Sequence, residues 1–299
     1  MNNDFLKPET RCGFYVDENR KRLWKIELDM LEIVDKICRE NEINYFLHSG
    51  SALGAVRHNG FIPWDDDLDL GMLRADFEKF VRIAKEQIQE PYFVQYGMND
   101  GGHICGLLRL RYSNSTGIIK IDREKNCNNG VYIEIYPFDN VPNGKLSQKI
   151  QFMESLILYH GLLAEYYGPM SKNQIVCRAI VRLMGKERAY ATWQKLCQKY
   201  NSKKTKYVNT VALPDYMREG IYRLDREWVE KVKDIPYEYT TVKVPIMVEE
   251  ILTLNYGNYM ELPPVEERGM VHAHTVFYDP NKPYSEYKNS KIVADYFAR

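Results

Sequence analysis

Residues 65–72, with the sequence Asp-Asp-Asp-Leu-Asp-Leu-Gly-Met, restrict the fold more than any other stretch of this chain. Leu68 and Leu70 alternate with Asp67 and Asp69, which is the two-residue period of a half-buried strand. On such a strand the two carboxylates project from one face about 7 Å apart, and they repel each other unless a cation lies between them. Hard divalent cations take oxygen ligands and leave positions open for phosphates. The stretch therefore predicts a metal site for phosphate chemistry.

A charged turn, with Asp65 and Asp66 as capping and turn residues, is the plainer alternative, and the upstream segment argues against it. Residues 45–47 form a short apolar strand, and a helix-compatible apolar run follows Gly50 and Ser51. A Gly-Ser turn between a strand and a helix presents backbone N–H groups and a hydroxyl to an anion. Placed about fifteen residues before an Asp-x-Asp strand, this turn indicates a nucleotidyltransferase-type site.

The segment between the turn and the acidic run adds a cation, Arg57, and a candidate proton carrier, His58. We interpret Arg57 as the group that stabilises charge on a transferred phosphoryl group. The residues predicted to contact substrate in this part of the chain are Gly50, Ser51, His58 and Asp65.

The whole segment from Leu47 to Asp69 closely resembles the signature of the LicD family, and weaker similarity continues to about residue 275. Bacterial members of that family resemble phosphocholine transferases of surface polysaccharides. Animal relatives include fukutin and the fukutin-related protein, which act as phosphosugar-alcohol transferases. The resemblance implies an α/β (α+β) fold, in which helices flank a nucleotidyltransferase-like mixed sheet.

A later strand, residues 131–136, carries one carboxylate, Glu134, on a face otherwise made of tyrosines. The simpler interpretation is that Glu134 lies on the solvent-exposed face of an edge strand. The functional interpretation is a third carboxylate beside Asp67 and Asp69, contributed by a neighbouring strand. The family usually has aspartate here, so Glu134 keeps the charge but adds a methylene group. Pro137 is expected to end the strand.

The resemblance further implies a phosphotransferase that moves a phospho-alcohol group, phosphocholine first, to a hydroxyl of a cell-surface glycan such as lipopolysaccharide, teichoic acid or capsule. The donor would be CDP-choline or another CDP-alcohol, and the cofactor Mg²⁺ or Mn²⁺. The predicted metal ligands are Asp67, Asp69 and Glu134, which with Arg57 form the catalytic set. Arg109 would contact substrate, as would His272 in a C-terminal segment that also contains Arg268.

Two other functions remain open from the residues alone. A nucleotidyltransferase acting on a sugar phosphate would use the same turn and carboxylates but would release pyrophosphate. A non-catalytic glycan-binding relative would keep the fold without the reaction. The identity of the alcohol, of the glycan and of the oligomeric state is not encoded in any motif that we identify.

The charge balance argues against nucleic acid as a partner. The chain of 299 residues has 41 lysines and arginines and 41 acidic residues, whereas a general nucleic-acid binder is usually basic. Six scattered cysteines without a Cys-x-x-Cys pair, a polar N-terminus and no apolar run of about 18 residues lead us to expect a cytoplasmic protein with reduced thiols. A lipid-linked acceptor would place it at the inner face of the membrane.

The change in residue pattern along the chain predicts three parts: a catalytic core at 1–145, a helical insert at 146–205, and a segment at 206–299 that packs back on the core. We expect the insert to pack on the sheet. The alternative is an amphipathic element that contacts a membrane, because arginines and lysines punctuate its apolar runs.

Overall fold

The computed structural model describes residues 4–101, 103–119, 126–169, 171–214, 223–268 and 275–287. Within them, a seven-stranded sheet has the order β10-β9-β8-β4-β3, with β6 paired to β8 and β5 paired to β6. The strands are β3 (Phe46–Leu47), β4 (Asp69–Leu73), β5 (Tyr92–Gly97), β6 (Cys105–Tyr112), β8 (Val131–Val141), β9 (Tyr207–Asn209) and β10 (Leu224–Asp225). Only β4 and β8 pair in parallel, so the predicted mixed sheet flanked by helices is confirmed.

The central strand β8 continues through Pro137, where we expected it to end. Its first part, 131–135, pairs with β6, and its last part, 139–141, pairs with β9. Pro137 lies in the gap between these two partners, where a missing N–H breaks no ladder hydrogen bond. The strand can therefore extend to Val141 and join both halves of the sheet.

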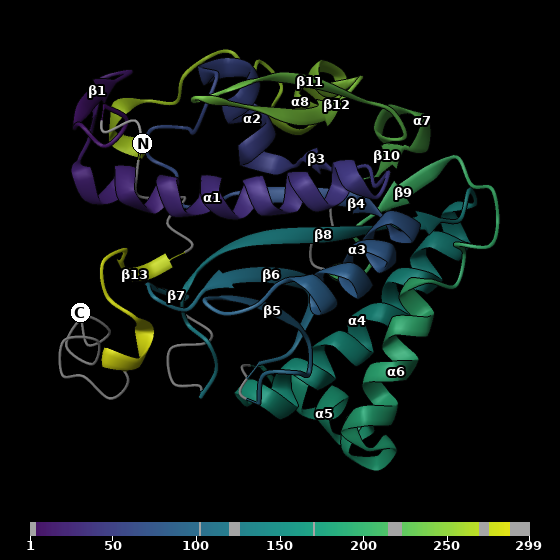
Figure 1. The fold of residues 1–299 in the computed structure, drawn as a ribbon. Coiled ribbons are helices and arrows are strands. Elements are labelled where there is room, and N and C mark those ends of the chain that lie inside the picture. The colour runs from purple at the N-terminus through teal and green to yellow at the C-terminus, as the bar shows by residue number, and fades with distance from the viewer. Residues whose placement is uncertain are drawn as a thin grey trace.

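Helices α1 (Glu18–Glu40) and α3 (Arg74–Gln87) cover one face of the sheet, as Figure 1 shows. The Asp17 side chain caps α1 by accepting from the backbone N–H of Arg20 at 2.8 Å. The main core forms between these helices and this face, and it contains Leu28, Leu31, Phe77, Phe80, Leu70, Leu110, Ile133 and Ile135. Because side chains alternate along a strand, the polar residues of the same strands project from the opposite face.

The helical insert predicted at 146–205 contains three helices among the described residues: α4 (Lys145–Tyr167), α5 (Lys172–Met184) and α6 (Lys186–Cys197). They pack on one another around their own cluster, which includes Leu162, Val181 and Trp193. In Figure 1 they lie together at one end of the molecule, away from the hairpin of β11 (Val232–Tyr237) and β12 (Thr240–Pro245).

The remaining elements are short strands, helices and turns around the main sheet. They are β1 (Glu9–Arg11), β2 (Phe14–Val16), α2 (Ser49–His58), β7 (Thr116–Ile119), α7 (Arg226–Val229), α8 (Val248–Tyr256) and β13 (Thr275–Asp279), with short 3-10 turns at Val265–Glu267 and Tyr284–Glu286. The late helix α8 packs beside α2, and β13 pairs with β7. Among the described residues, no helix has both the length and the apolar character needed to cross a bilayer.

Candidate active site

The acidic run lies just before and at the start of β4. Because β4 begins at Asp69, Asp67 precedes the strand, and the prediction that both residues lie on it is wrong for Asp67. The turn before the strand brings carboxylate oxygens of Asp65, Asp66 and Asp67 within 4.8 Å of one another. This cluster differs from the predicted ligand set, since Asp69 and Glu134 are outside it and Asp66 is inside it.

A cavity of about 300 Å³ opens beside this cluster. We call it the first cavity. Five predicted site residues line it together: Gly50, Arg57, Asp65, Asp67 and Asp69. The first turn of α2 and the segment after α8 complete it, with the aromatic residues Trp64, Tyr256 and Tyr259 on its walls. A Cβ atom on Gly50 would lie 2.9 Å from Asp65 Oδ2, so glycine at this position leaves room for the carboxylate.

The electrostatics of the first cavity suit a cation. Burial and the nearby Asp65 and Asp69 carboxylates raise the pKa of Asp67 well above its ordinary value. Burial, Glu134 and Asp65 likewise raise the pKa of Asp69. The Oδ1 atom of Asp69 is buried and has no hydrogen-bond partner among the described residues. A bound divalent cation would compensate both the repulsion and the missing partner, so these residues fit a metal site.

Arg57 supplies positive charge on the same cavity. Its Nη1 donates to the backbone carbonyls of Tyr259 at 3.0 Å and Glu261 at 3.2 Å, which holds the segment after α8 against α2. Burial lowers its pKa from the ordinary value. In the part of the chain that the structure describes, Arg57 pairs with no carboxylate, so its charge remains available to an anionic ligand.

Two predicted substrate-binding residues lie beside the first cavity without lining it. Ser51 Oγ accepts a hydrogen bond from the backbone N–H of Asp69 at 2.8 Å, which joins α2 to the start of β4. His58 Nε2 accepts from Arg57 Nε at 2.9 Å. Burial, followed by the Arg57 and Arg11 charges, lowers the pKa of His58 to about 4. In this arrangement both residues orient other groups of the site.

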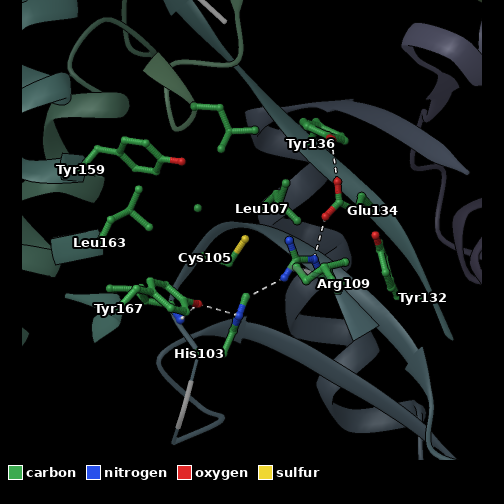
Figure 2. Close-up of a pocket in the computed structure, with 14 residues that line it drawn as sticks. His103, Cys105, Leu107, Arg109, Tyr132, Glu134, Tyr136, Tyr159, Leu163 and Tyr167 are labelled. Atoms are coloured by element: carbon green, nitrogen blue, oxygen red, sulfur yellow. Dashed lines mark hydrogen bonds and ion pairs between the residues drawn. The ribbon is translucent and has the colours of Figure 1, made fainter. Parts of the chain in front are cut away.

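Glu134 and Arg109 line a different cavity, of about 350 Å³, which we call the second cavity. Figure 2 shows its lining residues. Arg109 Nε donates to Glu134 Oε1 at 2.6 Å, and the Tyr136 hydroxyl donates to Glu134 Oε2 at 2.6 Å. Glu134 thus accepts hydrogen bonds from Arg109 on the neighbouring strand β6 and from Tyr136 on its own strand β8.

The strand register connects the two cavities. Asp69 on β4 is directly opposite Glu134 on β8, which is directly opposite Arg109 on β6. Residues in register on adjacent strands project from the same face. A side-chain hydrogen bond also joins Tyr136 to Asp69. The predicted third carboxylate therefore lies next to Asp69 on the same face of the sheet, although it lines the neighbouring cavity.

The C-terminal prediction can be followed only in part. His272 lies outside the described residues. Arg268, from the same segment, places its guanidinium 5.2 Å from the ring centroid of Trp64 and donates to the carbonyl of Cys12 at 2.6 Å.

Three buried polar residues of the site were missed from the sequence. Asp66, considered only as a turn residue in the charged-turn alternative, accepts from the backbone N–H of Thr275 at 3.1 Å. Glu27 of α1 is fully buried, and neither of its carboxylate oxygens has a hydrogen-bond partner among the described residues. Burial and the nearby Asp66 raise the pKa of Glu27 well above its ordinary value. Its signal in the sequence is a glutamate on the apolar face of α1, between Trp24 and Leu31; Tyr136 gave no such signal.

Comparison with known proteins assigns this arrangement to a family. Residues 42–178 match the family model described as the LicD/FKTN/FKRP nucleotidyltransferase domain, which includes the acidic cluster, Arg109 and Glu134. The lipopolysaccharide cholinephosphotransferase LicD of Haemophilus influenzae is 26% identical over 254 residues, which cover 84% of this chain and 94% of that protein. Residues 42–178 therefore form a LicD-type nucleotidyltransferase domain.

Other relatives are similar over shorter stretches. The human and mouse ribitol 5-phosphate transferases FKRP are 30% identical over 100 residues, or 32% of this chain and 17% of each relative. An uncharacterised protein of Rickettsia typhi is 39% identical over 84 residues, or 28% of this chain and 25% of the relative. The LicD-type nucleotidyltransferase domain is thus shared by proteins that carry different transferred groups in their names.

Proposed function

We propose that this protein is a metal-dependent phosphotransferase of the LicD family that moves a phospho-alcohol group from a CDP-activated donor to a hydroxyl of a cell-surface glycan. The observation that carries the proposal is the first cavity, where the acidic cluster, Asp69 and Arg57 meet the N-terminal turn of α2. Carboxylates that repel one another beside a free arginine favour a phosphate ligand together with a cation. The names of the Haemophilus and FKRP relatives favour a phospho-alcohol as the group transferred.

Asp65, Asp66, Asp67 and Asp69 would hold Mg²⁺ or Mn²⁺ in this proposal. The ion, when bound, neutralises charge on the donor pyrophosphate and on the departing CMP. Arg57 and the backbone N–H groups at the start of α2 orient the phosphates. The acceptor oxygen forms a bond to the phosphorus, the bond to CMP breaks, and Glu134 accepts the proton of the acceptor hydroxyl.

Phosphocholine is the group that the first cavity fits best. Trp64, Tyr256 and Tyr259 line it together with Glu261. Aromatic faces recognise quaternary ammonium groups through cation–π attraction, and a carboxylate adds to it. The similarity to a cholinephosphotransferase along nearly the whole of that relative supports the same choice.

The test is release of CMP from CDP-choline, CDP-glycerol and CDP-ribitol, each offered with Mg²⁺ and crude surface glycan. We expect CMP from CDP-choline, and we expect EDTA and Asp69→Asn to reduce the rate at least a hundredfold. Asp29→Asn, at a half-buried position of α1 that pairs with Lys25 and does not line the first cavity, serves as the matched control with full activity. Release of pyrophosphate from a nucleoside triphosphate and a sugar phosphate would instead establish the nucleotidyltransferase alternative.

Metal binding can be measured without catalysis. Calorimetric titration with Mn²⁺ is expected to show binding to the unmodified chain and none to Asp69→Asn. Metal at a hundred times its Kd stabilises the folded state by about 2.7 kcal/mol, which a thermal melt detects. Equal stabilisation of both proteins would contradict the metal site.

We also propose peripheral contact with a membrane through α5. Four large apolar side chains of this helix are exposed: Ile175, Val176, Ile180 and Leu183. Residues 172–206 contain ten lysines and arginines and one acidic residue, Glu187. An apolar helix face in a basic region suits a surface of anionic lipids, where a lipid-linked glycan would be found.

A further inference from the structure

The second cavity is lined by Glu134, which lies opposite Asp69 of the first cavity, and it has no assigned ligand. It is bounded by the polar face of β6 and β8 on one side and by α4 on the other, and it measures about 350 Å³. Sites for small ligands occupy roughly 300–1,000 Å³. In Figure 2, Glu134 and Arg109 lie on one wall, and the Tyr159 hydroxyl points into the cavity from the opposite side.

The wall nearest the sheet is fixed by a chain of hydrogen bonds. Arg109 Nη1 lies 3.3 Å from His103 Nε2, and His103 Nδ1 lies 3.1 Å from the Tyr167 hydroxyl. A guanidinium group can only donate, so His103 Nε2 accepts and Nδ1 carries the proton. The chain continues through Glu134 to Tyr136 and so to Asp69. A ligand in this cavity therefore meets a preorganised polar surface that ends at the first cavity.

The two cavities differ in whether their arginine is paired with a carboxylate, and this difference indicates the kind of ligand that each can bind. In the first, Arg57 pairs with no carboxylate of the described chain and is available to phosphate. In the second, the charge of Arg109 is balanced by Glu134 at 2.6 Å. A phosphate would have to compete with Glu134 for that arginine, whereas a neutral ligand would not. The second cavity therefore favours an uncharged ligand.

The remaining lining residues indicate which uncharged ligand. Four tyrosines and three leucines line the second cavity: Tyr132, Tyr136, Tyr159, Tyr167, Leu107, Leu163 and Leu213. Aromatic faces cover the apolar faces of sugar rings, while tyrosine hydroxyls exchange hydrogen bonds with sugar hydroxyls. We propose that the second cavity binds one sugar unit of the acceptor glycan and presents its attacking hydroxyl to Glu134. The assignment of the hydroxyl as the attacking group rests on the proposed function.

The test fills the cavity from α4. Leu163→Trp adds a large side chain on the wall opposite the sheet, and Met153→Trp adds the same side chain at a half-exposed position of α4 outside the cavity. We expect Leu163→Trp to raise the KM for glycan at least tenfold. The KM for the CDP-alcohol and the slow release of CMP to water without glycan should stay within twofold, which also shows that the variant is folded. Met153→Trp should leave all of these values unchanged.

A binding measurement keeps this inference separate from the proposed reaction. Saturation-transfer NMR with methyl hexosides and methyl N-acetylhexosaminides is expected to show contact with the unmodified protein, lost in Leu163→Trp and kept in Met153→Trp. Tyr159→Phe, which removes one hydroxyl, should weaken the signal without abolishing it. If no CDP-alcohol is turned over but this pattern is seen, the proposed reaction fails and the sugar site stands. Sugar binding that persists in Leu163→Trp, or a raised KM for the donor alone, overturns the inference.

Discussion

Gly50 shows how one absent side chain shapes the acidic cluster. Alanine at this position would place Cβ 2.9 Å from Asp65 Oδ2 and displace that carboxylate from the first cavity. Alanine is also the better helix former, by about 1 kcal/mol, so the fold should not lose stability. We therefore expect Gly50→Ala to lower Mn²⁺ affinity and CMP release at least tenfold while the melting temperature is kept or raised.

The matched control for this substitution is Gly101→Ala, where an added Cβ meets nothing within 4 Å. It should leave metal affinity, activity and melting temperature unchanged. Full metal affinity in Gly50→Ala would show that the position of the Asp65 carboxylate is unimportant.

The sequence predicted residues of the site best where chemistry and spacing coincide. The spacing of Gly50, Arg57, Asp67 and Asp69 around a strand and a helix start was enough to group them, and they line one cavity. Glu27 could not be found this way, because its place near Asp66 depends on how α1 packs over the sheet. The placement of Glu134 and Arg109 on a separate cavity likewise depends on α4, which is distant in sequence.

At the scale of elements, a buried ion pair fixes α3 to the end of β8. Arg74 donates from Nε to Asp139 Oδ1 at 2.8 Å and from Nη2 to Oδ2 at 2.6 Å, and Asn201 donates to the same carboxylate. Asp139→Asn leaves the buried Arg74 with only the exposed carboxylate of Glu78, 3.1 Å from Nη1, as its counter-charge, which costs about 3–5 kcal/mol. Urea unfolding should show this loss of stability.

The control is the exposed ion pair of Glu18 and Arg22. Glu18→Gln should lower the free energy of unfolding by less than about 1 kcal/mol. The double replacement Arg74→Met with Asp139→Leu should recover most of the stability, because it removes both charges together. An Asp139→Asn protein as stable as Glu18→Gln would mean that the pair does not hold α3 in place.

Local patterns predicted the elements well, and tertiary pairing decided their ends. The alternation of Leu108 and Leu110 with Arg109 and Arg111 predicts the strand at 105–112, and the predicted helical insert at 146–205 contains α4, α5 and α6. The extension of β8 past Pro137 does not, because it depends on two different partner strands that leave a gap at the proline. The start of β4 at Asp69 similarly depends on Ser51, whose hydroxyl accepts from the first amide of that strand.

Charge is distributed unevenly over the whole molecule, and this gives the membrane proposal a test. The chain is neutral overall, yet residues 172–206 are strongly basic. We expect the protein to sediment with vesicles containing phosphatidylglycerol and not with vesicles of phosphatidylcholine alone, with binding that falls as salt rises. Leu183→Glu removes roughly 1.5–3 kcal/mol of apolar burial, so binding should fall about tenfold or more.

Leu146→Glu is the matched control, because Leu146 is exposed on α4 and lies outside the α5 face. Its binding to anionic vesicles should equal that of the unmodified chain. Equal binding by Leu183→Glu would show that α5 does not enter the lipid surface.

The two cavities are built from different segments of the chain. Helix α2, the acidic run and the segment after α8 form the first, whereas β6, β8 and α4 form the second, and the paired residues Asp69 and Glu134 are where they meet. In the proposed function, recognition of the activated alcohol and recognition of the glycan would therefore rest on different segments and could diverge independently during evolution. Exchanging the α4 segment between relatives offers a route to enzymes that attach the same decoration to a different polysaccharide.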